Sequence, residues 1–71
     1  MIGGFGQQEV TEDHINIINT NTAAINTKLG INAASFTINQ VSSQVVAGVN
    51  YHFHLTADNA EKYTVRIFVP L

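Results

Sequence analysis

The apolar residues of this chain change their spacing at Gly30, and this change restricts the fold more than any other feature of the sequence. Before Gly30 they recur every three or four residues, which is typical of one face of a helix. After Gly30 they alternate with polar residues, which is typical of strands with one buried face. A chain of 71 residues has room for one small domain. The sequence therefore predicts a single α+β domain over residues 1–71, in which one N-terminal helix packs on an antiparallel meander of about four strands.

The predicted helix spans residues 11–29. Thr11 is in position to be the N-cap, and Gly30 is in position for a left-handed C-cap. Asn and Thr side chains lower the helix propensity, because they compete for backbone hydrogen bonds. We expect one apolar stripe to be buried, and we interpret the acidic residues Glu12 and Asp13 as partners of the helix dipole. The stripe consists of Ile15, Ile18, Thr22, Ile25 and Leu29.

The predicted meander spans residues 34–71, and residues 1–10 are expected to form a flexible arm or first strand. Phe36 and Ile38 alternate with polar residues, but Val41 breaks the alternation. We therefore predict a β-bulge between Ile38 and Val45. Asp58-Asn59 is a turn signal between the last two strands.

Composition excludes several function classes. Lys28, Lys62 and Arg66 are the only cations, so the chain offers no basic surface for a phosphate backbone. No apolar run is long enough to span a bilayer. The absence of cysteine excludes disulfides and thiol nucleophiles. Small secreted domains are usually stabilised by disulfides, and this chain has no cysteine and no visible signal peptide. We therefore expect a cytoplasmic protein.

No catalytic or cofactor motif occurs, so we expect neither enzyme activity nor a cofactor. His52 and His54 lie on one face of a predicted strand and could hold a metal weakly. A proper zinc site needs three or four ligands. We therefore favour two solvent-facing histidines and predict no metal site.

One segment is unusual, because Val45, Val46 and Ala47 are adjacent where the meander requires a hairpin turn. Apolar residues at an exposed tip are unfavourable unless a partner covers them. Gly48 supplies the backbone freedom that a tight bend needs. The alternative is that Val45 and Val46 are ordinary strand residues on opposite faces, and the pattern alone does not decide.

The run Gln44–Gly48 resembles the QVVAG signature of the cystatins, and Gln44–Tyr51 resembles that family's QVVAG-x-N-Y. An arm, one helix and an antiparallel meander is also the order of elements in that family. The lack of cysteine is similar to the type 1 branch, the stefins. The opening Met1–Gly4 is similar to the stefin start, so that the resemblance covers nearly the whole chain.

The resemblance implies reversible, tight-binding, noncovalent inhibition of papain-like cysteine proteases of the cathepsin type. In that family three segments form a wedge that enters the protease cleft. By the resemblance, the arm of the family corresponds to Met1, Ile2, Gly3 and Gly4. The first hairpin corresponds to Gln44, Val45, Val46, Ala47 and Gly48, and the third contact corresponds to Pro70 and Leu71. The family's last strand is missing here. The resemblance therefore implies an exposed edge on the preceding strand, and weaker binding than in a full-length relative.

A rival reading from another class is a structural, self-associating module. Straightening the turn at Ala47-Gly48 would let two chains exchange halves and form a domain-swapped homodimer. Such a dimer would lose the hairpin tip and have little or no inhibitory activity.

Overall fold

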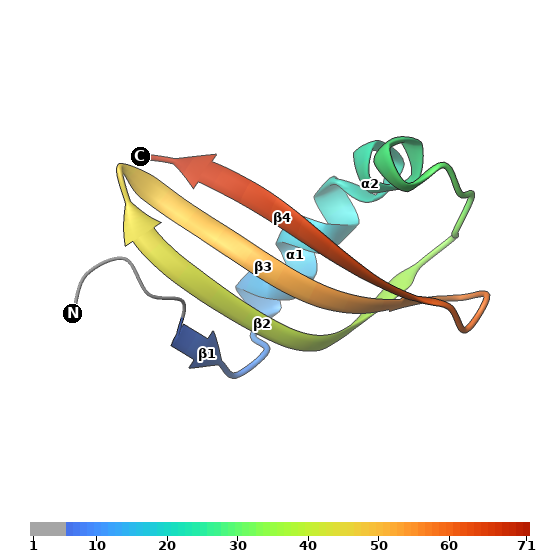
Figure 1. Cartoon of the computed structure of the whole chain (residues 1–71), viewed down its shortest axis with the longest axis horizontal. Helices are drawn as coiled ribbons and strands as arrows, with labels where there is room; N and C mark the ends of the chain where they lie inside the picture. The colour runs from blue at the N-terminus through green and yellow to red at the C-terminus, as the bar shows by residue number, and fades with distance from the viewer. Residues whose placement is uncertain (1–5) are drawn as a thin grey trace.

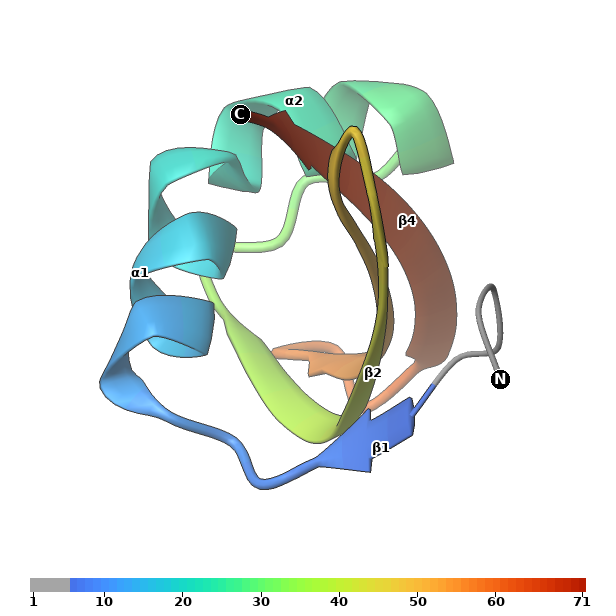
Figure 2. The same cartoon turned by 90° about the vertical axis from the view of Figure 1, so that its left-hand side faces the viewer.

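The helices of this chain cover one face of a four-stranded antiparallel sheet, as the sequence predicts (Figure 1). The computed structural model describes residues 6–71. The sheet order is β1-β2-β3-β4, and both helices lie on the concave side of the curved strands (Figure 2). The elements are β1 (Gly6–Gln8), α1 (Glu12–Thr20), α2 (Thr22–Leu29), β2 (Phe36–Val46), β3 (Gly48–Ala57) and β4 (Lys62–Pro70).

The predicted single helix is divided at Asn21, which separates α1 from α2. The Asn21 side-chain amide donates to the Ile17 carbonyl at 2.7 Å. The Thr22 hydroxyl donates to the Ile18 carbonyl at 3.0 Å. These side chains occupy carbonyls at the end of α1 and permit the break. Both outer ends agree with the prediction, because Thr11 is the N-cap and Gly30 is a left-handed C-cap with φ 69°.

The core lies between the helices and the inner face of the long strands. β3 contributes the alternate residues Phe53, Leu55 and Ala57, all buried. The apolar cluster at its centre consists of Ile18, Ile25, Val41, Phe53, Leu55 and Val65. Alternation along β3 therefore buries one face and leaves the histidines on the other.

The prediction that Ile15 is a buried core residue is wrong, because Ile15 is 41% exposed, whereas the neighbouring His14 is buried. His14 accepts a hydrogen bond from the Thr11 backbone N–H at its Nδ1 atom, at 3.0 Å. Its ring packs edge-on against Tyr51, with the centroids 5.6 Å apart. The imidazole thus caps the start of α1 and fills the space between α1 and β3.

The predicted bulge is present at Asn39. Ile38 lies opposite Leu55 and Gln40 lies opposite His54, so Asn39 is the extra residue on β2. Its side-chain amide donates to the Thr56 hydroxyl at 2.6 Å. The bulge brings Val41 to the same inner face as Ile38, and Val41 is fully buried.

Within residues 6–71, no helix has the length and apolar character needed to cross a membrane.

Candidate functional site

The hairpin between β2 and β3 ends in a very narrow tip. Val46 lies opposite Gly48, so Ala47 alone connects the two strands. Both valines before it belong to β2 and point to opposite faces of the sheet, as the alternative interpretation held. Both are nevertheless exposed, Val45 at 71% and Val46 at 47%. The exposed apolar tip that the sequence suggested is therefore present.

Gly48 is buried, and it supplies the backbone freedom that the tight bend was expected to need. Its φ is +144°, a backbone conformation that residues other than glycine rarely adopt. A Cβ atom here would lie 2.5 Å from the Val69 carbonyl oxygen and 2.8 Å from the Phe68 ring. The bare backbone of Gly48 thus lets β4 approach the hairpin closely. A substitution at Gly48 would disturb the fold itself.

The structure brings the predicted third contact to the hairpin tip. Pro70 lies opposite Gly48 in the β3–β4 ladder, and Leu71 follows it, fully exposed. Figure 1 shows the end of β4 beside the turn between β2 and β3. Gln44, paired with Asn50, is half-buried at the base of the tip.

Two residues of this apolar surface were missed by the sequence argument. Phe68 and Val69 are exposed and lie opposite Asn50 and Val49. Counting residues outward from the Asp58-Asn59 turn would have found them, because an antiparallel register fixes which residues face each other. We call Val45, Val46, Ala47, Phe68, Val69, Pro70 and Leu71 the apolar tip. None of these side chains is ionisable.

The predicted arm residues Met1, Ile2, Gly3 and Gly4 lie outside the described residues. The described chain starts at Gly6, which pairs with Ser43, three residues from Val46 along β2. β1 runs antiparallel to β2, so its first residue is the one nearest the apolar tip.

The two histidines of β3 lie on the outer face of the sheet, as expected. Their rings are stacked, with centroids 5.2 Å apart. Burial, together with the positive charges of Arg66 and His54, lowers the pKa of His52. Across the described residues, no three His, Cys, Asp or Glu side chains form a group that could hold a metal.

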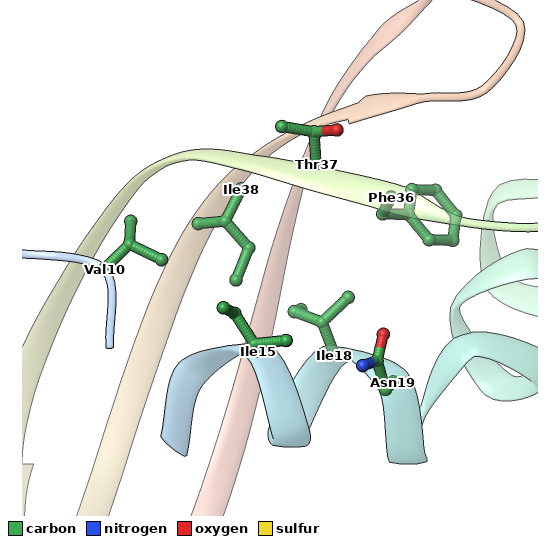
Figure 3. Close-up of a pocket in the computed structure, with 7 residues that line it drawn as sticks. All are labelled: Val10, Ile15, Ile18, Asn19, Phe36, Thr37 and Ile38. Atoms are coloured by element: carbon green, nitrogen blue, oxygen red, sulfur yellow. The ribbon is translucent and has the colours of Figure 1, made fainter. Parts of the chain in front are cut away.

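A separate hollow of about 260 Å³ lies between the start of α1 and β2 (Figure 3). Figure 3 shows Ile15 and Ile18 of α1 facing Ile38 of β2, with Val10 at one side. Its lining is almost entirely apolar, apart from Asn19 and Thr37. These residues include no acid or base, so the hollow offers no chemistry beyond apolar contact.

The chain matches no protein-family model, no curated protein and no solved structure. The class of protein to which this chain belongs is therefore defined by its fold and its exposed surface alone. It is a small α+β domain with an N-terminal helical region and a four-stranded antiparallel meander, with an exposed apolar tip at one end of the sheet.

Proposed function

We propose that this chain is a reversible, noncovalent inhibitor of papain-like cysteine proteases and is not itself an enzyme. The observation that carries the proposal is the apolar tip. Val45 and Val46 are exposed at the end of β2, next to the one-residue turn, and Pro70 lies opposite Gly48 on the other side of that turn. A partner that covers these side chains removes apolar surface from water. The likeness of Gln44–Gly48 to the cystatin signature indicates which partner that is.

Inhibition would be steric. The apolar tip carries no electrophile that a protease thiolate could attack, so it acts by filling the cleft. Two paired strands hold the tip in one conformation, which reduces the entropy lost on binding. The N-terminal arm, Met1–Gly4, would add contacts on one side, and Pro70 with Leu71 would add them on the other. Since the chain has no cysteine, it suits the reducing cytosol, where we place the inhibitor.

The test is a titration of papain, with hydrolysis of a small fluorogenic substrate as the signal. We expect competitive inhibition by the unmodified chain. Val45→Asp and Val46→Asp should each raise the inhibition constant about thirtyfold or more, as buried central contacts do. Val10→Asp is the matched control, because Val10 is 41% exposed and follows the end of β1 that pairs with Val41, away from the tip.

Thermal melts followed by circular dichroism must show that each variant is folded. Absence of inhibition by the folded unmodified chain at high micromolar excess would refute the proposal. Equal loss of inhibition in Val10→Asp would show that the apolar tip is not the contact surface.

The second candidate is a domain-swapped homodimer with little inhibitory activity. The one-residue connection at Ala47 favours it, since short hinge loops promote exchange of strands between chains. Size-exclusion chromatography beside the papain assay separates the two functions. A monomer that inhibits supports the first proposal, and an inert dimer supports the second.

A further inference from the structure

We propose that the outer edge of β4 binds an extended polypeptide segment in which acidic and apolar residues alternate. β4 contains nine residues and pairs with β3 on one side. Within residues 6–71, no strand pairs with its other side. The backbone N–H and C=O groups on that side are those that an added strand would use.

A narrow groove runs beneath this edge, between α2 and β4. Its volume is about 120 Å³, and Figure 2 shows α2 close to β4. The inward-facing Val65 and Ile67 of β4 form one wall. Side chains of an added strand point alternately to the two faces of the sheet. An inward-pointing side chain at the level of Val65 and Ile67 would therefore enter this groove, where an apolar residue fits best. The residues that form the groove include Ala24, Ile25, Lys28, Val65, Arg66 and Ile67.

The charges around this edge favour acidic residues at the positions of the added strand that point away from the groove. The only three Lys and Arg residues of the chain are Lys28, Lys62 and Arg66. Lys28 borders the groove on α2, and Lys62 and Arg66 lie on β4. Lys62 and Arg66 face the outer side of the sheet, because they alternate with the buried Val65. Carboxylates on the outward positions of an added strand would lie beside them.

The acidic residues of the chain lie away from the middle of this edge. Glu9, Glu12 and Asp13 lie at the β1 side of the molecule, around the start of α1. Asp58 and Glu61 lie in the β3–β4 turn, at one end of the edge. A chain with net charge −2 thus has a locally positive strand edge.

A second copy of this chain is a poorer occupant than an acidic segment. Pairing β4 with β4 of another copy would bring together four cations, Lys62 and Arg66 from each chain. Lysine and arginine on an edge strand oppose such self-pairing. The proposal does not depend on protease inhibition, because it uses the groove under α2 and the backbone edge along residues 62–67, which precede the part of β4 that belongs to the apolar tip.

The test uses a capped peptide of about eight residues in which Glu and Val alternate, a common strand length. A second peptide, in which Lys replaces every Glu, has the same apolar pattern and the opposite charge. Calorimetry measures the affinities, and amide shifts of the ¹⁵N-labelled chain map the site. We expect the acidic peptide to bind more tightly, with shifts along β4 and α2, and to bind more weakly as salt increases.

Variants separate the local charges from the net charge. Lys62→Gln and Arg66→Gln should each raise the Kd of the acidic peptide about two- to fivefold, as expected for exposed ion pairs. Asn16→Glu changes the net charge by the same amount at an exposed position on α1 and should leave the Kd almost unchanged.

Several results would overturn the proposal. One is the absence of binding at about 1 mM peptide. The others are equal affinity for the two peptides, and amide shifts confined to β1 or to the apolar tip. A dimer paired through β4, seen by ultracentrifugation and by amide protection of that strand, would identify a second copy as the occupant instead.

Discussion

Replacing Gly48 by alanine tests how the apolar tip is held in place. The added Cβ would lie 2.5 Å from the Val69 carbonyl oxygen, which is backbone and cannot rotate away. It would also lie 2.8 Å and 2.9 Å from two atoms of the Phe68 ring. The φ of +144° adds backbone strain that is independent of these contacts.

The chain contains two further glycines that separate these effects. Gly30 has a φ of +69° but no atom within 4 Å of an added Cβ. Gly6 likewise has no atom within 4 Å, and its φ is ordinary. We expect Gly6→Ala to change the unfolding free energy by less than about 0.5 kcal/mol. Gly30→Ala should cost about 1 kcal/mol, from the left-handed conformation alone.

Gly48→Ala combines strain with overpacking. Strain of about 1–3 kcal/mol and overpacking of about 1–3 kcal/mol give an expected loss of about 2–6 kcal/mol. A loss of this size would unfold much of a domain as small as this one. Urea denaturation followed by circular dichroism measures all three variants. If Gly48→Ala costs no more than Gly30→Ala, the close approach of β4 to Gly48 is not a constraint and our reasoning is wrong.

Two further predictions concern the histidines. His14→Ala should lower the unfolding free energy by about 1–3 kcal/mol, since it removes the hydrogen bond to the Thr11 N–H and the contact with Tyr51. His14→Gln should lower it less, because a glutamine at this position can still accept a hydrogen bond from the Thr11 N–H. Equal losses of the two variants in urea denaturation would argue against the cap. Folding lowers the pKa of His52 below 6.5, mainly through burial and then through the charges of Arg66 and His54. The imidazole of His52 therefore binds a proton more readily in the unfolded chain than in the folded chain. Stability should therefore fall as the pH decreases from about 7 through 6.5 towards the folded-state pKa. His52→Gln should remove this part of the dependence, and superimposable profiles for the two proteins would contradict it.

The parts of the fold that follow from local rules could be predicted from the sequence. Thr11 and Gly30 bound the helical region as predicted, because caps depend on a few neighbouring residues. The bulge could be predicted from the position of Val41 alone. The break at Asn21 could not be located, although competition from Asn and Thr side chains was expected, because many such residues occur along 16–27.

The candidate site was predicted unevenly for a related reason. The exposure of Val45 and Val46 follows from their place at a turn. The burial of Gly48 depends on β4, which pairs with it from more than twenty residues away in the sequence. The burial of His14 depends on Tyr51 and Phe53 of β3. Contacts between distant segments were therefore the ones that the local pattern did not contain.

The extra residue at Asn39 makes the first part of β2 sensitive to the length of the chain. Side chains of a strand alternate between its faces, so deleting this one residue would rotate every side chain on one side of the deletion by half a turn. With the hairpin kept in place, Phe36 and Ile38 would then point into water and Thr37 would point at the isoleucines of α1. A single-codon deletion here should thus do more damage than most substitutions on the same strand.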